Sequence, residues 1–417
     1  MAAVVPVAPS AGSIAPSAGR ERSVPRKVAL IVGNYVNVVD GVALTYGRVV
    51  RERLLAGDEL MVFAPGPGSG CRPPIEAAGA SVVLPSMAIP VQPEYRLALG
   101  IPRAQRRRLE AFEPELIHVA SPDLAGVAAL DFAAAHGLPT VAAYHSEIAR
   151  YLRYLPLWSR LPAPLAAGGA LLEGVVWAWI RRFYNRCGQV LVPTEATRTD
   201  LRRRGVVRPT ALWGRGVDLE RFSPRWRSPQ WRAGVGATGA HAPPVILFAA
   251  RLRWEKGLDV LCAVLRGLEA RGVPHTAVIV GEGPAAGELR RELPRAHFLG
   301  ALDVGALAQA YASADLFLYP SPTETFGNVT LEAMASGLTP LCADLLGSRS
   351  LVRDGETGTL VPAGDVSAFI EAAAALLADA PRRARLGRSA REYAAEHSWA
   401  VASARLARLW TEALGQD

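Results

Sequence analysis

The sequence predicts an α/β protein built on doubly wound, parallel sheets. Short apolar, β-prone segments alternate with segments whose apolar residues recur at helical spacing, which is typical of parallel strands joined by helices. The 417 residues are enough for two domains of ordinary size, each with its own core. A hydrophobic content of 50% with 20% charged residues excludes a chain that is disordered throughout.

The first 26 residues mix Ala, Pro, Ser and Gly and predict a disordered leader. They have neither the positive start nor the continuous apolar core of a signal peptide. Uninterrupted apolar runs of roughly 18 to 20 residues do not occur, so we expect no membrane-spanning helix. The cysteines form no C-x-x-C pair, and we expect buried free thiols in a reducing compartment at Cys71, Cys187, Cys262 and Cys342.

The net charge of +8, carried mostly by arginine, limits the classes of partner. A basic excess fits nucleic acid, an anionic membrane surface or phosphorylated substrates. The arginines are not interleaved with stacking aromatic residues in a repeated module, so we expect no nucleic-acid partner. A GC-rich genome would also enrich arginine and alanine, so the charge alone leaves membrane binding open.

Five segments in the first half are predicted strands, each bounded by turn residues or a helical pattern. They lie at 27–32, 57–65 (with its turn), 116–119, 139–146 and 189–194, and we take the last as the final strand of this half. Helices are expected at 124–136 and at 42–55, where Leu44, Val49 and Leu54 share one face.

Two residues of the first half are candidates for a binding site. Gly41 closes the loop after the first strand, where a glycine lets the backbone come close to a ligand. His145 falls at the carboxyl edge of the strand at 139–146, the edge at which open α/β sheets bind ligands. A single histidine is more often structural, so its position alone leaves its role open.

The segment 147–186 combines tyrosine, tryptophan and leucine with arginine around an Ala-Gly-rich middle. Such a mixture fits an interfacial surface, in which apolar groups enter the headgroup boundary and arginines pair with lipid phosphate. It fits equally well helices that pack into the first domain, and the two interpretations do not exclude each other.

The second half repeats the alternation of strands and helices after a linker with the run L-W-G-R-G-V-D at 212–218. We predict a leader at 1–26, a first domain at 27–215, a second domain at 216–398 and a final helix at about 399–417. The Arg-, Gly- and Pro-rich segment 223–244 and the segment 347–350 are predicted loops. Strands are expected at 245–250, 277–280, 297–300, 314–319, 339–344 and 354–361 (with its turn), and helices near 258, 285, 328 and 367.

The stretch from 319 to 337 carries the strongest chemical signal. A buried strand is followed by the loop S-P-T-E-T-F-G and then by a helix, capped at Thr325 or Asn328, that ends at Gly337. The start of such a helix offers free N–H groups and a positive dipole end to phosphate. Phe326, Gly327 and Asn328 are therefore candidate phosphate-binding positions.

Two glutamates, Glu324 and Glu332, flank this helix start. They are too far apart to form one tight acid pair, and acidic groups near a bound phosphate are suited to accept hydrogen bonds from sugar hydroxyls. A bare pair at this spacing would also fit two solvated glutamates at an ordinary strand–helix junction. The Phe-Gly between them and the A-M-A-S-G after them favour the binding site.

Arg251 and Lys256 bracket another loop at a strand end, in the run R-L-R-W-E-K-G. Two cations there can neutralise a diphosphate and hold a leaving nucleotide. Gly281 ends the next predicted strand in the turn G-E-G-P and is expected to help shape a nucleotide pocket. Surface cations are often only solvated. The order of these residues along the chain is what favours the phosphate-binding interpretation.

The run S-P-T-E-T-F-G-N-V-T-L-E-A-M-A-S-G resembles the signature of the retaining nucleotide-sugar glycosyltransferases of family four. The order strand, Arg251, Glu255-Lys256-Gly257 and helix is similar to the family's phosphate-clamping element. The linker run W-G-R-G-V-D is most similar to glycolipid mannosyl- and sulfoquinovosyltransferases. The resemblance implies the GT-B architecture, two Rossmann-like domains that face each other across a cleft, with the final helix packed back on the first domain.

The resemblance also implies the reaction and the roles of the site residues. A hexose would pass from GDP-mannose or a UDP-sugar to a hydroxyl of a lipid or glycolipid acceptor, with retained anomeric configuration. Glu324 would bind sugar hydroxyls, Glu332 the ribose, and His145 the sugar from the first domain, while Arg251 and Lys256 stabilise the leaving diphosphate. We expect no metal and no further cofactor. The leaving phosphate itself would take the acceptor proton, so no dedicated base is assigned. A cytoplasmic protein that associates with the inner face of a membrane would suit such an acceptor.

Other functions remain open at this point. The acceptor could be a soluble glycoside, and a sugar-nucleotide epimerase or a phosphorylase can share this architecture. A non-enzymatic sugar-nucleotide or lipid binder would keep the pocket without turnover. A dinucleotide oxidoreductase is disfavoured because no predicted strand ends in G-x-G-x-x-G with an acidic residue about 20 positions later.

Overall fold

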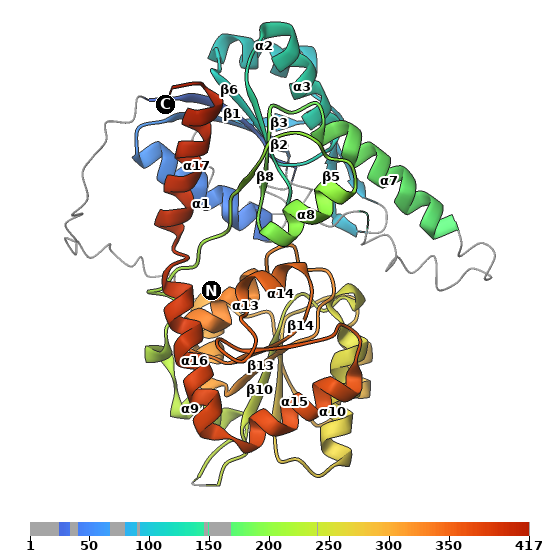
Figure 1. Ribbon diagram of the computed structural model, residues 1–417, viewed down its shortest axis with the longest axis vertical. Helices are drawn as coiled ribbons and strands as arrows, with labels where there is room; N and C mark the ends of the chain where they lie inside the picture. The colour runs from blue at the N-terminus through green and yellow to red at the C-terminus, as the bar shows by residue number, and fades with distance from the viewer. Residues whose placement is uncertain are drawn as a thin grey trace, which may run out of the picture.

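The computed structural model describes residues 25–33, 41–66, 80–89, 92–145, 149, 168–239 and 241–416. It contains two parallel sheets, each covered by helices and set one above the other in Figure 1, so the predicted fold class is confirmed. The predicted leader lies almost entirely outside the described residues, as does Cys71. The other three cysteines are free and buried, as expected.

The first sheet has the strand order β3-β2-β1-β6-β7-β8-β9, and all its neighbours pair in parallel. Its central strands β6 and β7 are buried along their whole length because helices cover both faces. The strands are β1 (Lys27–Ile31), β2 (Glu59–Pro65), β3 (Ala80–Leu84), β6 (Leu116–Val119), β7 (Thr140–Ala143), β8 (Gln189–Val192) and β9 (Thr210–Leu212). Among the described residues of this half, the named helices are α1 (Gly41–Leu55), α2 (Arg103–Phe112), α3 (Leu124–His136), α7 (Gly168–Tyr184) and α8 (Glu195–Arg203).

Two predictions for this half are wrong, and one hairpin is not predicted. β8 is not the last strand, because β9 pairs with it in parallel. An antiparallel hairpin of β4 (Ser86–Ile89) and β5 (Gln92–Ala98), which the sequence analysis does not predict, follows β3. In α1 the side chain of Leu44 is 46% exposed, because the buried face is rotated toward Ala43, Tyr46, Val49 and Val50.

The second sheet has the order β12-β11-β10-β13-β14-β15, again parallel throughout, with β15 at an edge as expected. Its strands are β10 (Val245–Ala249), β11 (Thr276–Val280), β12 (His297–Gly300), β13 (Leu316–Tyr319), β14 (Pro340–Ala343) and β15 (Thr359–Val361). Its helices are α10 (Leu258–Ala270), α11 (Ala286–Glu292), α12 (Val304–Ser313), α13 (Asn328–Ala335), α15 (Val366–Ala378) and α16 (Ala380–Ala395).

Two predicted loops of this half contain helices. The segment 223–244 forms the 3-10 helix η2 (Pro224–Trp226) and the helix α9 (Pro229–Gly234). Ser228 caps α9 by accepting a hydrogen bond from the N–H of Trp231, and Pro229 occupies the first turn, where its missing N–H costs nothing. The segment 347–350 lies within α14 (Leu346–Leu351).

The chain crosses between the two halves at two segments that run side by side. The N–H of Val217 donates to the carbonyl of His397 at 2.8 Å, and Val217 forms a parallel bridge with Ser398. Gly216 is required here because a Cβ at this position would lie 2.4 Å from Cα of Trp399. Beyond the second crossing, α17 (Trp399–Ala413) returns to the first half.

Helix α17 packs against α1 and β7 of the first half (Figure 1). Its residues Leu406, Leu409 and Trp410 are buried in one apolar cluster with side chains of β1, α1 and β7. Helix α17 therefore completes the core that surrounds β1.

Candidate active site

Lys256 and Glu324 are in direct contact at the carboxyl ends of β10 and β13, which are neighbours in the second sheet. The Nζ atom of Lys256 lies 2.5 Å from Oε1 of Glu324, and the two side chains are only 12% and 15% exposed. Gly257, which follows the 3-10 helix η3 (Trp254–Lys256), makes this approach possible. Its φ is +71°, and a Cβ there would lie 2.5 Å from the carbonyl oxygen of Pro320.

The carboxylate of Glu324 is held by three donors that converge on Oε1. Besides Lys256, the hydroxyl of Tyr319 donates at 2.6 Å and that of Ser321 at 3.2 Å. Burial acts to raise the pKa of Glu324, but the Lys256 ammonium and the three hydrogen bonds outweigh it and hold that pKa below its ordinary value. Glu324 is therefore an ionised acceptor at neutral pH.

The segment Phe326 to Asn328 opens α13, as the sequence predicts, but its cap differs from the prediction. Gly327, with φ of +98°, is the N-cap residue, and no side chain caps the helix. Neither Thr325 nor Asn328 fills that role, because the chain enters α13 through a left-handed turn that suits glycine. The first N–H groups of α13 are thus not capped by a side chain.

Two residues of the first half meet this helix start. A Cβ on Gly41 would lie 2.7 Å from Nδ2 of Asn328, so a larger residue there would displace the Asn328 side chain at the start of α13. The hydroxyl of Thr325 donates to the backbone carbonyl of His145 at 2.8 Å. The structure therefore brings Gly41, His145 and the loop of Glu324 together between the two sheets.

The ring of His145 is buried, with 8% of the residue exposed. Its Nε2 atom lies 2.8 Å from the hydroxyl of Tyr46, and its Nδ1 atom is bonded to the guanidinium of Arg215. Burial, followed by the nearby charge of Arg215, lowers the pKa of His145 well below its usual value. The imidazole is therefore neutral, which argues against a role as a cationic acid.

Arg251 is held by the first half as well. Its guanidinium donates to the hydroxyl of Tyr95, on β5 of the unpredicted hairpin, and lies 5.3 Å from the centre of the Tyr95 ring. The hairpin thus reaches across to the cation that is predicted to bind the diphosphate.

Gly281 and Glu332 border this region from the second half. Gly281 has φ of +128°, and a Cβ there would lie 1.8 Å from the carbonyl oxygen of Ala250, next to Arg251. Glu332, in α13, accepts a hydrogen bond from the Tyr311 hydroxyl at 3.3 Å. Burial raises the pKa of Glu332 to about 7, although the bond from Tyr311 acts to lower it.

Comparison with known proteins identifies the family to which the chain belongs. A family model described as Glycosyltransferase Family 4 matches residues 39–221, and one described as Glycosyl transferases group 1 matches residues 243–379. A GDP-mannose-dependent alpha-mannosyltransferase of Mycobacterium tuberculosis is 34% identical over 373 residues, 87% of this chain and 93% of the relative. The chain belongs to glycosyltransferase family 4. The resemblance found in the sequence is confirmed, and the protein is a hexosyltransferase.

Two further comparisons extend this result. A sulfoquinovosyl transferase of Arabidopsis thaliana is 31% identical over 396 residues, 92% of this chain and 73% of the relative. Sucrose-phosphate synthase from Thermosynechococcus elongatus superposes with a TM-score of 0.75 at 21% identity, over 94% of this chain and 100% of that structure. The second likeness shows the fold that the family 4 chain shares with that enzyme.

Some residues that build the family 4 site are not among the sequence candidates. Ser321 opens the signature run and Tyr319 lies two residues before it, so their closeness to Glu324 along the chain is the signal available. Arg215 stands in the W-G-R-G-V-D run, which was singled out only as a linker. Tyr46 and Tyr95 carry no local signal, because their roles follow from how α1 and the hairpin are placed in space.

The described residues contain no group of three or more His, Cys, Asp or Glu side chains that could hold a metal ion. A reaction without metal or cofactor remains a prediction for this family 4 enzyme. Among the helices that the structure describes, none is both long and apolar enough to cross a membrane.

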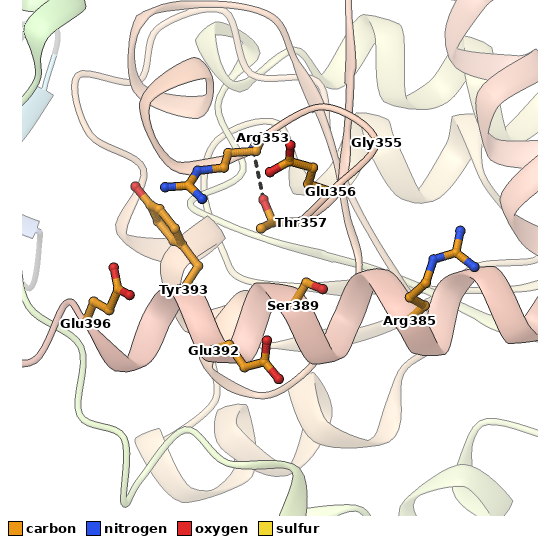
Figure 2. A pocket seen from close by; sticks show the side chains of 9 residues that line it. All are labelled: Arg353, Gly355, Glu356, Thr357, Arg385, Ser389, Glu392, Tyr393 and Glu396. Carbon is orange, nitrogen blue, oxygen red and sulfur yellow. Dashed lines mark hydrogen bonds between the residues drawn. The ribbon is translucent and has the colours of Figure 1, made fainter.

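A pocket of about 460 Å³ lies elsewhere on the second half, between the turn before β15 and the helix α16 (Figure 2). Its lining carries charges of both signs, including Arg353, Arg385, Glu356 and Glu392. It contains none of the candidate site residues of the family 4 signature. The candidate site residues lie in the region between the sheets instead.

Proposed function

We propose that this glycosyltransferase moves a hexose from a nucleoside diphosphate sugar to an acceptor hydroxyl with retention of anomeric configuration. The observation that carries the proposal is the buried contact of Lys256 with Glu324 beside the start of α13. This arrangement provides a cation and backbone N–H groups for a diphosphate, and an ionised carboxylate for sugar hydroxyls.

In the proposed reaction the bond from the anomeric carbon to the phosphate oxygen breaks, and a bond from the acceptor oxygen forms on the same face of the sugar. The proton of the acceptor hydroxyl passes to the leaving phosphate. Negative charge grows on the diphosphate as the bond breaks, so Arg251, Lys256 and the N–H groups of α13 lower the barrier by stabilising that charge.

The same geometry supports the roles proposed for the two glutamates. Glu324 is fixed through Oε1 by Lys256, Tyr319 and Ser321, so the carboxylate is oriented before substrate arrives. Glu332 lies in α13 on the same junction and is proposed to accept hydrogen bonds from the ribose.

GDP-mannose is the donor that we favour, because the relative from Mycobacterium tuberculosis is named a GDP-mannose-dependent alpha-mannosyltransferase and matches 87% of this chain. A UDP-sugar is the second candidate, because the linker run also resembles sulfoquinovosyltransferases and a sulfoquinovosyl transferase is 31% identical.

A lipid acceptor at an anionic membrane surface is supported by one face of α7, on the flank of the first half (Figure 1). Leu171, Val175 and Trp179 recur every fourth residue, so they form one stripe, and they are 74%, 58% and 41% exposed. Arg181 and Arg182 are exposed in the last turn of the same helix. Apolar side chains beside arginines suit the headgroup boundary of a membrane.

The test is product analysis with the full chain. GDP-mannose and UDP-sugars are first screened by thermal shift, since a ligand that binds the folded state raises the melting temperature. The stabilising donor, labelled in its sugar, is then incubated with and without a lipid extract. Transfer that requires the lipid supports the proposal, whereas turnover without acceptor indicates an epimerase or hydrolase. Binding without any turnover would indicate a non-catalytic protein.

A further inference from the structure

Five buried side chains form a continuous hydrogen-bond chain through the first half. The indole N–H of Trp410 donates to Nδ1 of His118 at 3.0 Å, and Nε2 of His118 lies 2.8 Å from the Tyr46 hydroxyl. The same hydroxyl lies 2.8 Å from Nε2 of His145, whose Nδ1 is bonded to Arg215. None of the five residues is more than 8% exposed.

The donors at the two ends fix the direction of the bonds. An indole and a guanidinium can only donate, so Trp410 makes Nδ1 of His118 an acceptor, and Arg215 does the same for Nδ1 of His145. Burial lowers the pKa of His118 to about 3, and that of His145 is lowered as well, so both rings are neutral. A neutral imidazole carries a proton on only one of its two nitrogens. Because Nδ1 is the acceptor in each ring, each ring carries its proton on Nε2 and donates it to Tyr46.

We propose that Tyr46 is a positioning residue for His145. Its oxygen accepts the Nε2–H of His145 and thereby fixes both the tautomer and the angle of the ring. The Tyr46 hydroxyl also accepts the Nε2–H of His118, and Nδ1 of His118 accepts the indole N–H of Trp410. These two bonds fix the position of Tyr46 independently of His145. This role rests on the proposed function, in which His145 faces the donor sugar.

The tautomer has a chemical consequence at the site. With Nε2–H bonded to Tyr46, Nδ1 is the nitrogen of His145 that can accept a hydrogen bond. A substrate hydroxyl can replace Arg215 at that nitrogen without disturbing the bond to Tyr46. His145 is thus prepared as an acceptor for a sugar hydroxyl and not as a proton donor.

One end of the hydrogen-bond chain lies beside a crossing between the halves, and the other end lies on the helix that follows the second crossing. Arg215 directly precedes Gly216, and Trp410 belongs to α17, which begins directly after Ser398. The carbonyl of His145 also accepts the hydroxyl of Thr325, next to Glu324. The ring is therefore held by side chains of the first half while its backbone is tied to the loop that carries Glu324.

The tautomer is tested by nuclear magnetic resonance on the full chain labelled with ¹⁵N-histidine at neutral pH. The seven histidines are few enough to assign His145 and His118 from the spectra of the His145→Asn and His118→Asn variants. We expect both rings to be neutral with the proton on Nε2. A proton on Nδ1 of either ring, or a cationic His145, would overturn the proposal whether or not the protein transfers sugar.

The positioning role is tested by Tyr46→Phe, which removes one oxygen and keeps the aromatic ring. We expect kcat to fall about tenfold to a hundredfold with the donor KM changed by less than about twofold, because the acceptor is misplaced while the diphosphate contacts remain. The matched control is Tyr184→Phe, a buried tyrosine of the same half whose hydroxyl donates to the carbonyl of Ala143 at 3.2 Å.

Equal losses in kcat for the two variants would show a general packing effect and contradict the proposal, as would unchanged kcat in Tyr46→Phe. If Tyr46→Phe does not fold, Trp410→Phe takes its place, because it removes the donor to His118 at the far end of the hydrogen-bond chain, together with part of the buried indole. There we expect the Nε2–H signal of His118 to weaken and kcat to fall. An unchanged tautomer and unchanged kcat in Trp410→Phe would overturn the proposal.

Absence of transfer by the wild-type protein would refute the proposed function, while the tautomers would still be decided by the spectra.

Discussion

Lys256 and Glu324 are the residues at which the fold and the proposed chemistry meet most directly. Each alone would be an expensive group to bury, and the pair lowers that cost because the two charges lie 2.5 Å apart. In the proposed reaction the ammonium has a second partner, the diphosphate, whose charge grows as the sugar leaves. The ion pair therefore holds the Lys256 ammonium in place where negative charge develops on the diphosphate.

Replacing Lys256 with alanine should reduce kcat roughly 10²- to 10³-fold, the loss typical for one missing donor to a developing anion. The chain has only one other lysine, Lys27 at the start of β1, and Lys27→Ala serves as the control. Steady-state kinetics with the stabilising donor measures both variants. Wild-type turnover in Lys256→Ala would refute the assignment of this residue to the diphosphate.

Glu332 should make nucleotide binding depend on pH near neutrality. Its pKa of about 7 means that roughly half of the free protein carries a protonated Glu332 at pH 7. Ribose hydroxyls bind the carboxylate better than the acid, so we expect affinity to fall as the pH drops below 7, by up to about tenfold per pH unit. Calorimetric titration with GDP from pH 5.5 to 8 measures this, and Glu332→Gln should give a flat profile.

The same shift has a defined sign for stability. The folded pKa of Glu332 lies above the unfolded value of 4.5, so folding favours the protonated form. This contribution to stability is fully present below about pH 4.5 and is lost as the pH rises through about 7. The decline of melting temperature over this range should therefore be smaller in Glu332→Gln than in the wild type.

At the scale of single elements, helix α7 combines the two interpretations of the segment 147–186. Ile180, Phe183 and Tyr184 are buried in the core of the first half, which is the packing role. Leu171, Val175 and Trp179 face outward, which is the surface on which the lipid proposal rests. Residues 150–167, which include several of the aromatic and arginine residues, lie outside the described part of the chain.

Replacing both Leu171 and Val175 with serine should weaken binding to vesicles that contain an anionic lipid, because both side chains lose the apolar surface that would enter the headgroup boundary. Flotation of the protein with such vesicles measures the bound fraction. Val207→Ser is the control, since Val207 is 80% exposed but lies outside α7. Failure of the wild type to float would favour a soluble glycoside as the acceptor.

The apolar strands were the elements easiest to predict, because burial on both faces leaves nearly continuous runs such as V-I-L-F-A in β10. The hairpin of β4 and β5 was missed since its sequence, with Pro, Gln, Glu and Arg, has no such run. Helix α14 was read as a loop because G-S-R-S is turn-like. Its conformation depends on tertiary contact instead, as the N–H of Gly347 donates to the carbonyl of Glu324 at 3.0 Å.

At the scale of the whole molecule, the site is formed by contacts between the halves. Gly41 meets Asn328, Thr325 bonds to His145, Arg251 bonds to Tyr95, and Arg48 forms an ion pair with Asp218 at 2.6 Å. For several of these contacts, the family signature in the sequence identifies one of the two partner residues. It could not supply the other partner, because no local pattern records which loops face each other after folding.

The crossing at Gly216 should tolerate no side chain. In Gly216→Ala the new Cβ would meet the backbone of Trp399, which cannot move without separating the two crossing segments. We expect the free energy of unfolding to fall by about 1–3 kcal/mol, the usual cost of overpacking. Denaturant unfolding measures this. Gly174→Ala is the control, because nothing lies within 4 Å of its new Cβ, and in helix α7 it should be neutral or slightly stabilising.

The position of α17 also governs the order in which the protein can be finished during synthesis. Domains generally fold as units while the ribosome elongates the chain. Here Val28 and Leu30 are covered by Leu406, Leu409 and Trp410, which are synthesised only after the whole second half. The nascent first half must therefore wait with an open apolar flank until α17 has been synthesised, whereas the second half already has all its strands. A stop codon before α17 would release a polypeptide with that flank permanently bare, a natural target for chaperones and proteases.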